Sequence, residues 1–153
     1  MTNNDVLRRL RYTFDFKDSK MISLFAESGL GVTREQVSDW LKREEEPSFV
    51  RCKDIELAHF LNGLIVERRG KREGDAPVAE RRLNNNLILR KLKIALEYKT
   101  EDLLSVMELG GLRVSAHEMS AFFRRENHKH YRVCEDQILR NFLRGLQLRL
   151  RPD

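Results

Sequence analysis

Two cysteines and a pair of histidines are the residues whose types and spacing could support chemistry in this chain. Cys52 and Cys134 could act as nucleophiles, form a disulfide or bind a metal. His128 and His130 precede Cys134 in an H-x-H-x3-C pattern, and metal sites can be built from such ligands. A thiol nucleophile would need a nearby base, however, and no histidine stands near Cys52 in sequence.

We interpret both cysteines as small buried residues and the histidine segment as a solvated loop. The chain has no C-x-x-C motif, and His59 and His117 are too distant in sequence to predict a complete metal site. Phosphate-binding glycine loops, H-E-x-x-H and G-x-S-x-G are also missing from the sequence. The prediction is a protein that is not an enzyme, with no metal and no cofactor.

Composition limits the class of protein further. The 153 residues are 41% hydrophobic and 35% charged, which suits one globular domain or two small ones. No apolar run approaches the roughly 18 residues that a membrane span needs, and the polar start leads directly into a helical pattern. We therefore expect a soluble, cytoplasmic protein without a membrane partner.

An internal repeat is the strongest signal in the sequence. Residues 3–70 align without a gap on residues 85–152, with 21 identities in 68 positions. The segment between them, residues 71–84, begins in a stretch rich in glycine and charge and reads as a linker. Because each copy is near the lower size limit for an independent core, we expect the two copies to pack as one pseudo-symmetric body.

Each copy carries four segments with helical spacing of apolar residues, and alternating strand patterns are absent, so the predicted class is all-α. Asn3 and Asn4 are predicted to cap the first helix. Thr33 and Ser115 are predicted to cap the third helix of their copies, each with a capping-box partner three residues on. The predicted caps of the fourth helices are Asp54 and Asp136.

Gly63 and Gly145 occupy equivalent positions inside the predicted fourth helices. Glycine within a helix costs about 1 kcal/mol relative to alanine, so its presence in both copies indicates a close backbone approach. We expect that approach where the fourth helices cross, with the interface between the copies as one location.

The repeated segments resemble a known family, the YehS-like bacterial proteins, whose domain of unknown function usually occurs in two tandem copies. The resemblance rests on residues 60–65 with 67–71, on residues 80–86, and on residues 142–146. It covers essentially the whole chain and implies a two-copy helical protein. It implies no activity, substrate or catalytic residue.

The segment from Ala26 to Leu41 resembles a helix-turn-helix, in which a second helix enters the major groove of DNA. Its alanine-to-glycine spacing is one residue longer than usual, and Glu35 and Asp39 would repel phosphates. Packing of two helices at a sharp turn is the favoured interpretation. DNA binding and a protein-binding groove with Trp40 as an anchor are the alternatives.

The basic excess lies in the second copy. Residues 1–70 hold 12 basic and 12 acidic side chains, whereas residues 85–153 hold 13 and 9. A basic face can neutralise phosphates, although most charged helix faces are simply solvated. The candidate nucleic-acid-binding residues are Arg34, Lys42, Arg43, Arg90, Lys91, Lys93, Arg124 and Arg125.

The sequence therefore favours a non-enzymatic binding or adaptor module whose partner is another protein. The alternative is a nucleic-acid-binding protein, with a regulatory role, that uses its third helices or its basic faces. The sequence does not give the oligomeric state or the identity of the partner.

Overall fold

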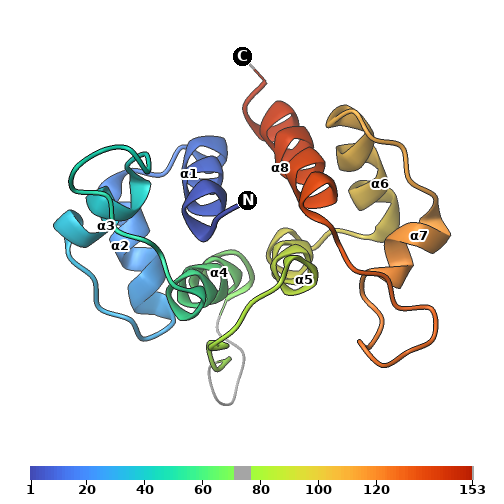
Figure 1. The fold of residues 1–153 in the computed structure, drawn as a ribbon, viewed down its shortest axis with the longest axis horizontal. Coiled ribbons are helices and arrows are strands. Elements are labelled where there is room, and N and C mark those ends of the chain that lie inside the picture. Colours follow the sequence, from blue (N-terminus) through green and yellow to red (C-terminus); the bar gives the residue numbers. More distant parts are fainter. Residues whose placement is uncertain (71–76, 153) are drawn as a thin grey trace. The chain divides into compact units, whose positions relative to one another are not determined.

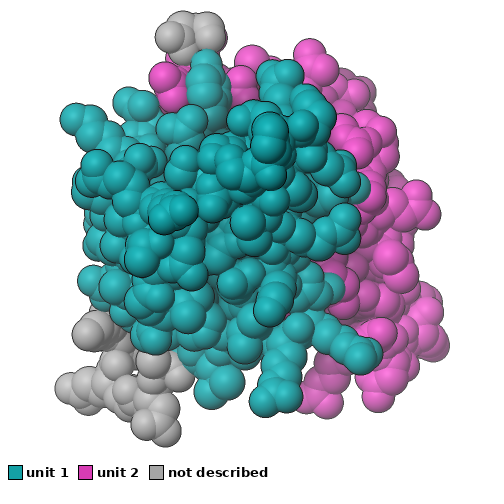
Figure 2. Space-filling model, turned by 60° about the vertical axis from the view of Figure 1, so that its left-hand side comes forward, with its two compact units in different colours: residues 1–83 teal, residues 84–153 magenta. Residues whose placement is uncertain are grey.

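The computed structural model describes residues 1–70 and 77–152, and within these residues it is all-helical, with eight helices and no strand. The predicted all-α class is confirmed. The chain divides into two compact units, residues 1–83 and 84–153 (Figure 2). Residues 71–76 of the predicted linker lie outside the described residues. The packing of the two copies as one body stays a prediction.

The first unit contains four helices, α1 (Asn3–Phe14), α2 (Asp18–Glu27), α3 (Arg34–Leu41) and α4 (Asp54–Arg69) (Figure 1). Helix α4 packs along α2, and the short α3 packs on α2 and α1. The core centres on Phe25, whose ring lies 5.3 Å from that of Trp40 and 5.4 Å from that of Phe60. Apolar residues at helical spacing thus bury one stripe of each helix.

The second unit repeats this arrangement with α5 (Asn85–Leu96), α6 (Thr100–Leu109), α7 (Ala116–Ala121) and α8 (Asp136–Leu150). Helix α8 packs along α6, α7 packs on α6, and α5 packs on α8. Equivalent positions also share unusual backbone: Asp15 and Glu97 both have φ of 56°, and Gly29 and Gly111 have φ of 94° and 95°. The two glycines follow the ends of α2 and α6 in the left-handed conformation that favours glycine.

The predicted capping boxes of the third helices are present. The Thr33 hydroxyl accepts a hydrogen bond from the Gln36 amide at 3.1 Å, and the Ser115 hydroxyl accepts one from the Glu118 amide at 3.1 Å. The other predicted caps were wrong. Thr2 caps α1 and Asn84 caps α5, while the residues that precede α4 and α8 provide no side-chain cap. The asparagines and aspartates assigned to these caps make longer-range bonds instead.

Gly63 and Gly145 lie at a close backbone approach, but within each copy rather than between fourth helices. A Cβ atom at Gly63 would lie 1.8 Å from the Leu24 carbonyl oxygen of α2. A Cβ atom at Gly145 would lie 1.8 Å from the Val106 carbonyl oxygen of α6. Each glycine therefore lets the fourth helix of its unit contact the second helix backbone to backbone.

Candidate functional site

A buried asparagine at the start of each unit fixes the loop that follows the third helix. In the first unit, Asn4 Nδ2 donates to the carbonyl oxygens of Trp40 and Val50, both at 2.9 Å, and Asn4 Oδ1 accepts from the Cys52 amide at 3.0 Å. The loop ends are therefore held by one side chain. All three polar positions of the asparagine amide are used in a site from which water is excluded.

The second unit contains the same three bonds. Asn86 Nδ2 donates to the carbonyl oxygens of Phe122 at 3.0 Å and Arg132 at 2.8 Å, and Asn86 Oδ1 accepts from the Cys134 amide at 2.9 Å. We call these two residues, Asn4 and Asn86, the clamp asparagines. Each holds the beginning and the end of its loop together.

The neighbouring asparagines support the clamp from the other side. Asn3 Nδ2 donates to the Cys52 carbonyl at 3.1 Å and to Asp54 Oδ1 at 2.7 Å. Asn85 makes the equivalent bonds to the Cys134 carbonyl and to Asp136 Oδ1, at 3.0 and 2.8 Å. The repeated Asn-Asn and Cys-x-Asp patterns are therefore one structural network.

The backbones of the two clamped loops make the same turns. In the first unit the Glu46 amide donates to the Arg43 carbonyl at 3.0 Å, and the Phe49 amide donates to the Glu46 carbonyl at 3.1 Å. The same two turns recur in the second unit, where His128 donates to Arg125 at 2.9 Å and Tyr131 donates to His128 at 3.0 Å. The two loops therefore have similar backbones and differ in their side chains.

Charge distinguishes the two loops. Residues 42–52 contain three basic and three acidic side chains, whereas the equivalent residues 124–134 contain four basic side chains and one acidic side chain. We call residues 124–134 the basic loop. Because the two loops make the same backbone turns, the replaced side chains place a different net charge on a similar loop.

One basic position of the basic loop has lost the acidic partner that its equivalent has in the first unit. Lys42 Nζ lies 2.9 Å from Asp39 Oδ1, but the positions equivalent to these two are Arg124 and Ala121. In the part of the chain that the structure describes, Arg124 makes no ion pair, and neither do the exposed side chains at the two other basic positions nearby, Arg125 and Lys129. Three cationic groups are therefore left without a neutralising carboxylate.

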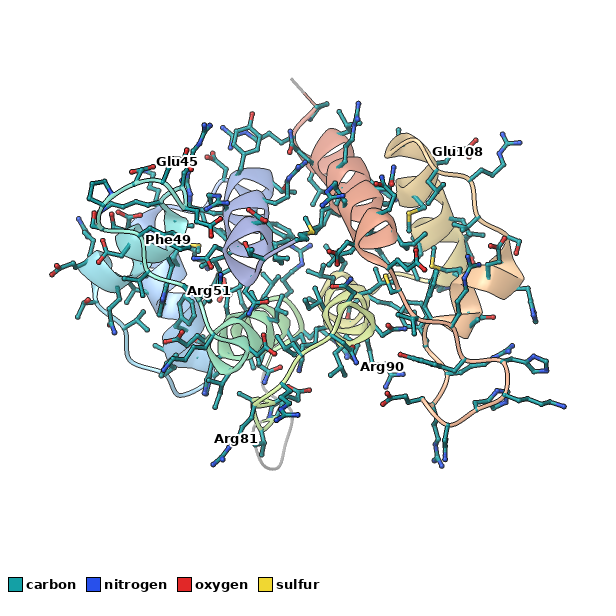
Figure 3. The ribbon with its side chains drawn as sticks, in the orientation of Figure 1. Glu45, Phe49, Arg51, Arg81, Arg90 and Glu108 are labelled. Carbon is teal, nitrogen blue, oxygen red and sulfur yellow. The ribbon has the colours of Figure 1, made fainter. Side chains whose placement is uncertain are left out.

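Helix α5 adds two cations beside the basic loop. Arg90 donates to the Phe123 carbonyl at 2.6 Å, and Lys93 Nζ lies 5.4 Å from the centre of the Phe123 ring. Both contacts place the α5 side chains at the point where the basic loop begins, and Arg90 is labelled in Figure 3. Lys91 is only 8% exposed and offers little surface. We call the following five residues the basic surface: Arg90, Lys93, Arg124, Arg125 and Lys129.

Arg132 differs from these residues because it has an acidic partner. Its guanidinium donates to Glu118 Oε2 at 2.5 Å, and this bond lowers the pKa of the Glu118 carboxyl. The same guanidinium lies 5.7 Å from the centre of the Phe122 ring. Arg132 therefore holds the end of the basic loop against α7.

Of the remaining predicted residues, Arg34 lies exposed at the start of α3 and Arg43 lies exposed just after α3. Both belong to the first unit, where Lys42 is paired with Asp39. The basic surface contains four of the eight candidates, and its fifth residue, Lys129, is the one that sequence reasoning missed. The alignment of the two copies could have identified Lys129, because it places this lysine opposite the uncharged Pro47.

The two cysteines are buried, at 2% and 1% exposure. Burial raises the pKa of the Cys52 and Cys134 thiols to about 12, so both are protonated near neutral pH. A protonated thiol is a poor nucleophile and a poor metal ligand. The arrangement therefore gives thiol chemistry no support.

The fold brings His117 close to His130, although the two are distant in sequence. Their ring centres lie 6.3 Å apart, and the rings of His128 and His130 lie 5.6 Å apart. Within the described ranges, no group of three or more histidine, cysteine or acidic side chains is arranged to hold a metal ion. The three rings are exposed on the surface of the second unit.

The third helices are short, and their apolar residues face inward. Helix α7 has six residues, which makes it about 9 Å long. Trp40, the candidate anchor for a protein partner, is 3% exposed and packs in the core. Nor, among residues 1–70 and 77–152, is any helix both long enough and apolar enough to cross a membrane.

The fold and its network define a tandem protein with two copies of one small helical unit. Comparison with known proteins places it more narrowly. Residues 3–70 and residues 85–151 each match the model of a family described as "Protein of unknown function (DUF1456)", and the chain belongs to this family. The resemblance inferred from the sequence is confirmed.

A similar protein is the "Uncharacterized protein YehS" of Escherichia coli (strain K12). It is 46% identical to this chain over 151 residues, which cover 97% of this chain and 96% of the relative. No solved structure matches the chain. The family description and the relative's name give no partner and no reaction, so function has to be argued from the site.

Proposed function

We propose that this protein is a non-enzymatic binding module and that the basic surface of its second unit binds nucleic acid. One observation carries the proposal: two loops with the same backbone turns differ in net charge, because residues 42–52 hold three basic and three acidic side chains whereas residues 124–134 hold four basic side chains and one acidic side chain. A set of unpaired cations on a rigid loop attracts phosphates, and the counterions released on binding favour the complex.

A protein partner was the leading hypothesis from the sequence, and it remains untested. Its named anchor, Trp40, is buried in the core, so that hypothesis now has no specific residue behind it. DNA reading through the third helices stays an alternative, with α3 of the Ala26–Leu41 segment eight residues long and its equivalent α7 only six. The basic surface is the feature that supports a partner of stated chemistry.

Charge reversal on the basic loop tests the proposal. The double variant Arg125→Glu with Lys129→Glu is expected to bind labelled nucleic acid at least about tenfold more weakly, because two phosphate contacts become repulsions. Fluorescence anisotropy at low salt measures the change. Both residues are exposed, so the fold should be retained, which circular dichroism verifies.

Arg43→Glu provides the matched control, since Arg43 is equivalent to Arg125 and equally exposed but lies on the neutral loop of the first unit. This variant is expected to bind nearly as well as the parent protein. Equal losses in the control and the double variant would mean that net charge, rather than the basic surface, governs binding, and the proposal would fail.

A further inference from the structure

The basic loop carries planar rings as well as cations. His128, His130 and Tyr131 lie within it, and His117 of α7 lies beside it. The three histidines are exposed and Tyr131 is half-exposed. In Figure 3 several side chains of the loop after α7 extend outward from the ribbon. The loop therefore presents rings to a ligand instead of packing them in the core.

The rings form a connected group. The ring of His130 lies near both other histidine rings, with its centre 5.6 Å from that of His128 at an interplanar angle of 43° and 6.3 Å from that of His117 at an angle of 67°. His128 Nδ1 also accepts a hydrogen bond from the His130 amide at 3.0 Å, which holds the first ring against the loop backbone. The rings are therefore placed by local contacts on a loop whose ends are clamped by Asn86.

These histidine rings occur only in the copy that has the excess of positive charge on this loop. The positions equivalent to His117, His128 and His130 are Glu35, Glu46 and Ser48, none of which has a ring. The position equivalent to Tyr131 is Phe49, which is also half-exposed, so the first copy keeps one of these rings. The second copy adds three exposed histidine rings to an excess of positive charge, and the first copy has neither the histidines nor the excess. Glu126 is the one acidic side chain of the basic loop.

We infer that the basic surface binds a single-stranded polynucleotide, with unpaired bases stacked on the rings of His128, His130 and Tyr131 while the cations contact the phosphates. Bases in a duplex have their faces covered by neighbouring pairs, so only a single strand offers faces to these rings. Ring stacking tolerates any base, which predicts little sequence preference. The inference rests on the proposed function, because it specifies the class of nucleic acid that the same surface takes.

The experiment compares probes that share phosphates but differ in their bases. Labelled single-stranded oligonucleotides of about 20 nucleotides, one of RNA and one of DNA, are titrated with the protein. Unlabelled duplex of the same sequence and inorganic polyphosphate are then added as competitors. Single strands are expected to bind at least about fivefold more tightly than duplex at equal phosphate concentration. The two sugar forms show whether the natural strand is RNA or DNA.

Two variants of the central ring complete the test. His130→Ala is expected to weaken single-strand binding by about 5-fold or more, whereas His130→Phe, which keeps a ring, should stay within about 3-fold of the parent. Neither variant should alter polyphosphate binding. If duplex or polyphosphate competes as well as single strand, or if His130→Ala binds normally, the inference is overturned while the proposed function stands. If no probe binds at low salt, polyphosphate included, the proposed function itself fails.

Discussion

Gly145→Ala is expected to destabilise the second unit by about 3 kcal/mol or more, because the new methyl group has no space. Its Cβ would lie 1.8 Å from the Val106 carbonyl oxygen and 3.0 Å from the Gly110 nitrogen, both of which are backbone atoms. Helices α6 and α8 would have to separate, and the core between them would lose contacts. The gain in helix propensity, about 1 kcal/mol, is too small to compensate.

Urea denaturation followed by circular dichroism measures this loss. Gly31→Ala is the matched control, since a Cβ there meets nothing within 4 Å and the residue needs no left-handed backbone. The control should change the free energy of unfolding by less than about 0.5 kcal/mol. A stable Gly145→Ala protein would mean that α6 and α8 do not approach as closely as described.

Asn86→Asp is expected to cost about 3 kcal/mol, although the two side chains have almost the same shape. A carboxylate cannot donate, so the carbonyl oxygens of Phe122 and Arg132 would each lose a hydrogen bond. The substitution would also place a negative charge at a position that is only 8% exposed, where the charge is poorly hydrated. The clamp that closes the basic loop would open.

Asn127→Asp is the control for this substitution. Asn127 lies exposed on the same loop, and the same chemical change there should alter the free energy of unfolding by less than about 0.5 kcal/mol. Thermal or urea unfolding of both variants separates the loss of the clamp from the added negative charge. Similar stability for the two variants would rule out the clamp as a source of stability.

Local signals in the sequence predicted local structure well. Thr33 with Gln36 and Ser115 with Glu118 are capping boxes because each pair satisfies backbone amides only three residues apart. The helical class follows from apolar spacing along each segment. Both kinds of signal depend on neighbours in the chain, which a sequence displays directly.

Predictions failed where the partner lies far along the chain. Asn3 and Asn4 have the residue type and position of helix caps, yet their amides donate to oxygen atoms of residues 36 to 51 positions away. Asp54 was assigned to a cap for the same reason, but it accepts from Asn3 and from the Leu83 amide at 2.8 Å. The composition of a segment does not reveal which of two satisfying bonds an asparagine or aspartate will make.

The candidate site was predicted in part. Arg90, Lys93, Arg124 and Arg125 were identified by charge, but the gathering of these cations on one surface depends on tertiary contacts such as the bond from Arg90 to the Phe123 carbonyl. The approach of His117 to His130 depends on how α7 meets the loop, so it could not be read from spacing. The repeat contained one usable signal, because an alignment of the two copies shows each acidic residue that the second copy has lost.

The most direct test of the account is the salt dependence of nucleic-acid binding by the parent protein, measured by fluorescence anisotropy with a mixed-sequence single strand. Five cations on the basic surface predict that the logarithm of the association constant falls against the logarithm of salt concentration with a slope of about −3.5. Affinity should therefore drop by more than tenfold between about 50 and 200 mM salt. Absence of binding at the lowest salt, or affinity that does not change with salt, would contradict a phosphate-binding surface on the second unit.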